Sequence, residues 1–168
     1  TAAATAEFEA AAKVSPQLPD VHFGLGYMYW RQQRYEEAAR EFEAELASQP
    51  QHAQALTYLG DSELRREKSE PAEKHLRQAL KLAPETRLAH LDLGMILSRT
   101  DAAVEAIQHF REAIRLDPAK PDAHYRLGRL LSSLGRDKEA QIEFDQVKKL
   151  AAEEPPPPLV RLPGQRLP

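Results

Sequence analysis

The sequence contains no cysteine, and this absence excludes several kinds of chemistry. Without a thiol there can be no disulfide bond, no thiolate nucleophile and no cysteine-ligated metal. Asparagine is absent as well, so the chain has no acceptor for N-linked glycosylation. None of these absences assigns a compartment, and both the cytoplasm and the periplasm stay open.

Long apolar runs and an excess of basic residues are also missing. No stretch approaches the roughly 20 apolar residues that a membrane-spanning helix needs, so we expect a soluble protein with no membrane insertion. The 23 Lys and Arg residues are outnumbered by 26 Asp and Glu residues, which gives a formal net charge of -3. Binding to nucleic acid requires a strong basic excess on one face, so we expect no nucleic-acid partner.

The residues that are present repeat with a period of 34. A Leu-Gly pair, an alanine, a large apolar residue and a closing proline recur at this spacing. The Leu-Gly pairs are Leu25-Gly26, Leu59-Gly60, Leu93-Gly94 and Leu127-Gly128; the alanines are Ala38, Ala72, Ala106 and Ala140; the large residues are Phe42, Leu76, Phe110 and Phe144; the prolines are Pro50, Pro84 and Pro118. A helix-turn-helix unit of this length predicts a stack in which each helix pair contacts mainly its neighbours.

The period also predicts how the chain is divided. Residues 1–18 are expected to be the second helix of a truncated repeat, since Ala4, Phe8 and Pro16 lie one period before matching residues; we therefore expect a fragment of a longer array. Four full repeats are predicted at 19–52, 53–86, 87–120 and 121–154. The run from Pro155 to Pro158 predicts a proline-rich extended tail over 155–168.

On these residues the chain resembles the tetratricopeptide repeat (TPR) family, over residues 1 to about 152. The resemblance implies an all-α fold, a right-handed α-solenoid of stacked antiparallel helix pairs. Small residues such as Gly94 and Ala106 are expected to face each other and let the paired helices approach closely. Glu45 and Glu63 depart from the family pattern, and we expect each to weaken a packing contact.

The resemblance also implies a binding surface, because in the family the first helix of each pair lines the concave face. The predicted partner-binding residues are Phe23, Tyr27, Trp30, Thr57, Tyr58, Asp61, Leu88, Leu91, Asp92, Met95, Tyr125, Arg126 and Arg129, and Arg99 falls on the same face. This lining is apolar and aromatic with acidic points in the middle. It predicts a helical or extended ligand with Leu or aromatic anchors and one or two basic residues. For any single residue, packing between helices is the competing interpretation.

One known ligand class of the family is not expected here. Chaperone-binding members hold a terminal carboxylate with Lys, Asn and Arg side chains on the concave face. The corresponding residues of the first three repeats are Phe23, Tyr27, Tyr58, Leu88 and Asp92, and one repeat later they are Thr57, Asp61, Asp92, Asp122 and Arg126. Neither set can hold an anion in that way, and the three aspartates of the second set would repel one.

Arginine recurs at the thirteenth repeat position, as Arg31, Arg65 and Arg99. These side chains are expected to complement the negative ends of the first helices, with phosphate recognition as the alternative interpretation.

Signals for catalysis or metal binding are weak. His22, His90 and His124 share the fourth repeat position, but equivalent residues of stacked repeats lie roughly 10 Å apart and cannot share one metal ion. They are expected to pack between helices. Gly24-Leu25-Gly26 begins like a dinucleotide-binding loop, yet no strand precedes it. No nucleophile elbow is present. We therefore predict no enzymatic activity, no cofactor and no metal.

The sequence predicts a non-catalytic scaffold that binds a peptide or helical segment of a partner protein in a concave groove. Two alternatives stay open. The chain could be the targeting or regulatory region of a larger enzyme, or a self-assembly module whose tail docks in its own or a neighbour's groove. The tail composition favours the second, since Leu159, Val160, Leu162 and Leu167 alternate with Arg161 and Arg166.

Overall fold

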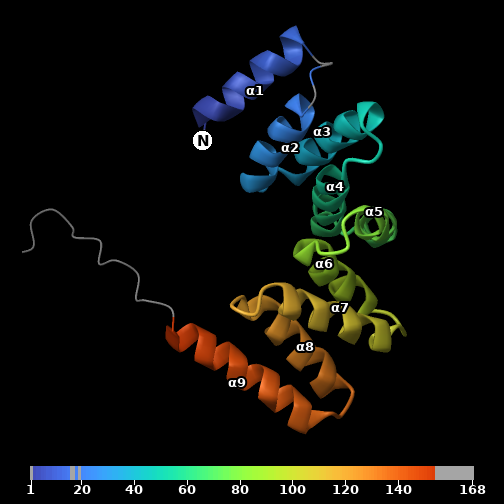
Figure 1. Cartoon of the computed structure of the whole chain (residues 1–168), viewed down its shortest axis with the longest axis vertical. Coiled ribbons are helices and arrows are strands. Elements are labelled where there is room, and N and C mark those ends of the chain that lie inside the picture. The colour runs from blue at the N-terminus through green and yellow to red at the C-terminus, as the bar shows by residue number, and fades with distance from the viewer. Residues whose placement is uncertain (1, 16–17, 19, 154–168) are drawn as a thin grey trace, which may run out of the picture.

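The computed structural model describes residues 2–15, 18 and 20–153 (Figure 1). These residues form nine helices and no strand. The helices are α1 (Ala2–Val14), α2 (Val21–Arg31), α3 (Tyr35–Ser48), α4 (Ala53–Arg65), α5 (Ser69–Leu82), α6 (Arg87–Leu97), α7 (Ala103–Leu116), α8 (Pro121–Ser133) and α9 (Asp137–Glu153). None of them is long and apolar enough to cross a membrane. The tail predicted at 155–168, and with it any tail-in-groove contact, lies outside the described residues.

The helices pack in sequence order and form an all-α solenoid. Each 34-residue unit proposed from the sequence contains one pair: α2 with α3, α4 with α5, α6 with α7, and α8 with α9. Neighbouring pairs join where α3 meets α4, α5 meets α6 and α7 meets α8, and α1 packs on α2. The first helices also touch one another, α2 against α4 and α4 against α6. Figure 1 shows α1 and α9 at opposite ends of the stack, both toward the left of the view.

Amphipathic spacing determines which side of each helix is buried. In α7, Ala106, Phe110 and Ala113 are buried at helical intervals, whereas Val104 on the opposite side is 74% exposed. Helices α4 and α6 lie inside the stack, and every residue from Leu59 to Leu64 and from Leu91 to Leu97 is buried. The most enclosed part of the core therefore surrounds these two helices.

The glycines of the Leu-Gly pairs set the distance between paired helices. From the sequence we expected these glycines to face alanines, but the structure places the large residue of the second helix directly on each glycine. A Cβ added to Gly94 would lie 2.6 Å from Cδ1 of Phe110, closer than real Cβ contacts allow. The same relation joins Gly26 to Phe42, Gly60 to Leu76 and Gly128 to Phe144. Any side chain at these positions would push the paired helices apart.

The two departures from the repeat pattern make polar contacts instead of apolar ones. Glu45 is 1% exposed, and its carboxylate accepts hydrogen bonds from the backbone N–H groups of Phe23 at 2.9 Å and Asp20 at 3.3 Å. It thus caps the start of α2, where Asp20 itself makes no side-chain capping bond. Glu63 lies 2.8 Å from Nδ1 of His75, which connects α4 to α5. In both cases a polar contact between helices replaces the expected packing contact.

The glycine contact generates a first prediction. Gly94→Val should lower the free energy of unfolding by about 1–3 kcal/mol, because the new methyl groups overlap the buried Phe110 ring. Urea denaturation followed by circular dichroism measures the change. Gln108→Val places the same side chain at an exposed position of α7 and should change stability by about 0.5 kcal/mol or less. Equal losses in the two variants would contradict the proposed role of the contact.

Candidate peptide-binding face

The predicted partner-binding residues all come from the first helices, α2, α4, α6 and α8, but the structure exposes only some of them. Tyr125 and Arg129 are exposed; Phe23, Tyr27, Trp30, Tyr58, Leu88 and Arg126 are half-buried; Thr57, Asp61, Leu91, Asp92 and Met95 are buried. The accessible part of this face is therefore aromatic at the α2 end and cationic at the α8 end.

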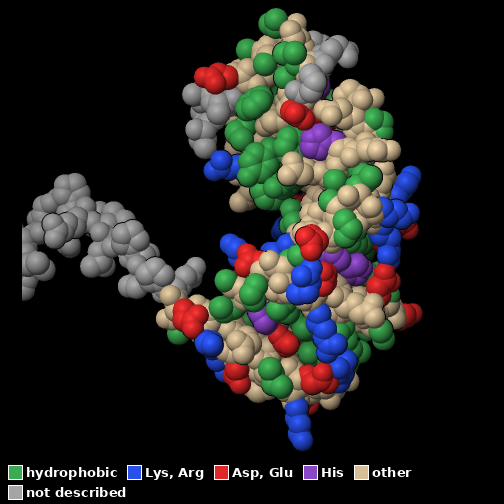
Figure 2. Space-filling model, in the orientation of Figure 1, with side chains coloured by type: hydrophobic (Ala, Val, Ile, Leu, Met, Phe, Trp, Pro, Cys, Tyr) green, Lys and Arg blue, Asp and Glu red, His purple; other side chains and the backbone are tan. Residues whose placement is uncertain are grey.

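Four aromatic residues of α2 and α4 pack together, and we call Phe23, Tyr27, Trp30 and Tyr58 the aromatic cluster. The rings of Tyr27 and Trp30 are stacked with centroids 5.9 Å apart, and Tyr58 meets Trp30 edge-on at 4.9 Å. Burial is the main cause that raises the pKa of Tyr58. Figure 2 shows hydrophobic side chains gathered over α1 and α2, above a recess in the molecule. The cluster offers a rigid, partly solvent-exposed aromatic surface.

Asp61 supports this cluster from beneath. Its Oδ2 accepts a hydrogen bond from Nε1 of Trp30 at 2.6 Å, and its Oδ1 accepts bonds from Nε and Nη2 of Arg65 at 3.2 and 3.1 Å. Asp61 is 0% exposed, so both of its oxygens are used within the protein. Its role in the structure is to fix the indole ring and to connect α2 with α4.

Asp92 is buried one helix further along the stack. It is 0% exposed, and neither carboxyl oxygen has a hydrogen-bond partner among the described residues. Burial, reinforced by the nearby Asp61 charge, raises the pKa of Asp92 well above its ordinary value, while Arg65 opposes the shift. Folding therefore favours the neutral form of this carboxyl.

The burial of Asp61, Asp92 and Thr57 contradicts one expectation drawn from the sequence. The two aspartates were expected to place acidic points on the surface that a ligand touches, and Thr57 was expected on the same surface. The structure buries all three instead, and their exposed fractions are 0%, 0% and 2%. The accessible face therefore offers none of these carboxylates to a basic ligand.

At the other end of the face a cavity of about 280 Å³ lies between α6 and α8. It is lined by Met95, Ser98, Arg99, Phe110, Arg126, Arg129, Leu130 and Ser133. Three of these, Met95, Arg126 and Arg129, belong to the predicted partner-binding set. From the sequence we expected Arg99 to complement the negative end of the α6 dipole. In the structure it lines the same cavity as Arg126 and Arg129.

The histidines of the fourth repeat position each contact the second helix of their own pair. Nδ1 of His22 lies 2.7 Å from Glu41, and Nδ1 of His124 lies 2.6 Å from Glu143. In the third repeat the partner is His109, whose Nδ1 is 2.9 Å from Nδ1 of His90. Burial and the neighbouring imidazole lower the pKa of His109. These contacts hold each helix pair together. Among the described residues, none of them joins histidines of two different repeats.

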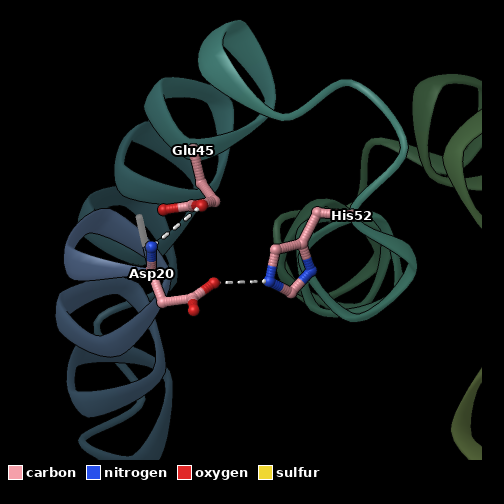
Figure 3. A group of neighbouring side chains, drawn as sticks. All are labelled: Asp20, Glu45 and His52. Atoms are coloured by element: carbon pink, nitrogen blue, oxygen red, sulfur yellow. Dashed lines mark hydrogen bonds and ion pairs between the residues drawn. The ribbon is translucent and has the colours of Figure 1, made fainter. Parts of the chain in front are cut away.

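Among the described residues, Asp20, Glu45 and His52 are the group with metal-ligand spacing (Figure 3). Nδ1 of His52 accepts a bond from the Ala55 N–H at 3.2 Å, so its Nε2 carries the proton and donates to Asp20 Oδ1 at 3.2 Å. Glu45 already caps α2 and also accepts a bond from the Gln49 side chain. Because these atoms satisfy helix ends, the group works as a set of caps in this structure.

The capping role predicts a stability change. Glu45→Ala should lower the free energy of unfolding by about 1–3 kcal/mol, because it leaves two partly buried N–H groups at the start of α2 without an acceptor. Glu43→Ala, at an exposed position of α3, is the matched control and should have little effect. Thermal unfolding with and without added Ca²⁺ or Zn²⁺ distinguishes a helix-capping role of this group from a metal site. A metal-dependent rise in melting temperature that Glu45→Ala abolishes would assign a metal site instead.

The buried Asp92 predicts a pH dependence. An unfolded aspartate ionises at a pKa of about 3.9, whereas the folded protein holds the Asp92 proton to higher pH. The unfolded state thus releases this proton first, and the contribution of Asp92 to stability falls as the pH rises above about 4. Asp92→Asn removes that loss, so at about pH 8 it should stabilise the protein by on the order of 1 kcal/mol, with the difference shrinking toward about pH 4.

Urea denaturation at the two pH values measures this difference between Asp92→Asn and the wild type. Asp101→Asn, at an exposed position, is the control and should show no such dependence. An Asp92→Asn variant whose stability tracks the wild type at both pH values would show that Asp92 is ionised in the folded protein.

Comparisons with known proteins agree with this architecture. One family model of the tetratricopeptide repeat matches residues 1–53, 29–70 and 57–121, and a second matches residues 97–157. The sequence matched none of the curated proteins with which it was compared.

Several solved structures share the fold. MamA from Desulfovibrio magneticus RS-1 is 21% identical, with a TM-score of 0.78 over 89% of this chain and 85% of that chain. YrrB, described as a TPR protein with an unusual peptide-binding site, is 22% identical, with a TM-score of 0.72 over 89% of this chain and 77% of that chain. A thermophilic TPR protein of Thermus thermophilus, TTC0263, is 21% identical, with a TM-score of 0.69 over 89% of this chain and 82% of that chain. At these identities the likeness concerns the fold, and together with the family matches it leads to one conclusion: the chain belongs to the tetratricopeptide repeat family.

Proposed function

We propose that this chain is a non-catalytic scaffold that binds a peptide or helical segment of a partner protein along the concave face of α2, α4, α6 and α8. The aromatic cluster is the observation that carries the proposal. Its four rings lie side by side on two adjacent first helices and are only half-buried. Aromatic side chains dominate the energetics of protein interfaces because they bury a large area at low entropic cost.

The cluster is held in place before any partner arrives. Phe23 and Tyr58 each rest on the buried Phe42, with ring centroids 5.9 Å apart in both cases. Trp30 is fixed by its hydrogen bond to Asp61. Side chains that are already ordered lose little freedom on binding, which favours affinity. The inner side of the cluster thus belongs to the core, and its outer side is open to a ligand.

A protein or peptide partner agrees with the comparisons. TPR arrays are protein-interaction scaffolds, and the structural neighbour YrrB is described as having a peptide-binding site. We expect no nucleic-acid partner, given the formal net charge of -3. Self-association through residues 155–168 stays a proposal that rests on composition, since those residues lie outside the described part of the chain.

Trp30 makes a direct test possible, because it is the chain's single tryptophan. Peptides selected from a random displayed library against the wild-type protein are titrated while tryptophan emission is recorded. Binding at the aromatic cluster should change the emission, since Trp30 stacks on Tyr27 and meets Tyr58. Tyr27→Ala and Tyr58→Ala should each weaken binding roughly tenfold or more.

Ile142→Ala is the matched control, because Ile142 is 60% exposed on α9, outside the proposed face. Circular dichroism checks that all three variants fold. Peptides that bind both tyrosine variants as tightly as the wild type, without altering Trp30 emission, would place binding away from this face and refute the proposal.

A further inference from the structure

Three arginine side chains, Arg99, Arg126 and Arg129, line the cavity between α6 and α8. No hydrogen bond or ion pair joins the guanidinium groups of Arg99, Arg126 and Arg129 to other described residues. Most other described arginines do have acidic partners; Arg77, for example, bonds to Glu73 at 2.8 Å and to Glu105 at 2.7 Å. Three uncompensated cations around one cavity attract anionic groups.

A purely structural role explains only one of them. Arg99 follows the end of α6 and can interact with its negative dipole end. Arg126 and Arg129 lie within α8, upstream of its last turn, where no such role exists. The hydroxyls of Ser98 and Ser133 donate to carbonyls of their own helices, at 2.9 and 2.7 Å. The arginines are therefore the donors that a ligand in this cavity would meet.

The floor of the cavity is apolar. Met95, Phe110 and Leu130 line it and are 9%, 1% and 7% exposed. At about 280 Å³ the cavity is just below the range of pockets for drug-sized molecules, which suits one or two amino-acid side chains. A hydrophobic floor beneath a cationic rim matches an apolar side chain next to a negatively charged one.

We propose that this cavity, which we call the arginine pocket, binds a peptide segment of the partner in which an Asp or Glu stands next to an apolar residue. The carboxylate would accept bonds from Arg126, Arg129 and Arg99, and the apolar side chain would cover Met95 and Leu130. This inference rests on the function proposed above and specifies the charge of the ligand. It reverses the basic ligand expected from the sequence, because Asp61 and Asp92 are buried while the arginines are not.

The chemistry of the pocket favours a peptide over a phosphate polymer. A nucleic acid would have to bring charged phosphates onto the apolar floor, and the chain as a whole carries a formal charge of -3. The tail's Arg161 and Arg166 have the wrong charge for this pocket. An acidic segment of another protein satisfies both the cationic rim and the apolar floor.

Peptide selection tests the charge preference. A random displayed peptide library is selected in parallel against the wild type and against the Arg126→Glu, Arg129→Glu double variant. Wild-type selections should be enriched in Asp or Glu beside apolar residues, and the double variant should lose this enrichment or favour Lys and Arg. An acidic peptide from the wild-type selection should bind the double variant roughly tenfold or more weakly, and its affinity for the wild type should fall as salt is added.

Arg31→Glu supplies the matched control. Arg31 occupies the same repeat position as Arg99, is exposed and has no ion pair with described residues, but it lies at the other end of the face. This variant should bind the acidic peptide as the wild type does. Equal losses of peptide affinity in Arg31→Glu and in the double variant would attribute the effect to the overall charge of the protein. That outcome would contradict the proposed arginine pocket.

The outcomes separate this inference from the proposed function. Peptides that depend on Tyr27 and Tyr58 but show no acidic enrichment would overturn the arginine pocket and leave the scaffold function intact. A selection that enriches no peptide would overturn both. Mixed-sequence single-stranded DNA is tested in the same assay. If it binds more tightly than the peptides and depends equally on Arg126 and Arg129, the ligand of the pocket is a nucleic acid and the peptide proposal is wrong.

Discussion

The contact between a glycine and a large apolar side chain inside each helix pair is the constraint on which the whole array depends. It occurs four times, from Gly26 on Phe42 to Gly128 on Phe144. Since the missing Cβ lets a ring or a leucine lie directly on the first helix, the same close approach recurs in every pair. Pairs built in the same way stack regularly, and regular stacking brings the first helices together on one face. The second repeat uses Leu76 where the others use phenylalanine, so the contact needs bulk and not aromaticity.

Residues at one repeat position have very different surroundings along this face. At the sixth position, Tyr58 is half-buried, Asp92 is fully buried, and Arg126 is half-buried beside a cavity. At the ninth position, Asp61 bonds to Trp30 and Arg65 under the surface, whereas Arg129 is exposed. These differences follow from the neighbours. Helix α4 contacts α2 on one side and α6 on the other, while a cavity opens between α6 and α8.

The sequence was sufficient to predict the helices and their pairing, because these depend on a spacing that repeats along the chain. It was not sufficient to predict which of the inward-facing residues are exposed. Glu45 interrupts the pattern of small residues, and its capping role depends on how α3 crosses the start of α2, 22 to 25 residues away in sequence. The burial of Asp61 and Asp92 depends in the same way on the contact between helices of neighbouring repeats. The repeat position of a residue specifies the side of the helix on which it lies. Its exposure depends on packing against residues that are distant in the sequence.

The buried acids also determine how the arginines act. Two ionised surface aspartates in the middle of the face would have offset much of the positive potential at the α8 end. Instead, Asp61 is compensated locally by Arg65, and burial favours the neutral form of Asp92. Arg99, Arg126 and Arg129 therefore keep an attraction for anions that Asp61 and Asp92 do not cancel. Because the glycine contacts face the second helices and no described ion pair involves Arg99, Arg126 or Arg129, the side chains at these three positions can change without disturbing the stack. A change of charge at those positions can therefore alter the choice of partner while the fold stays the same.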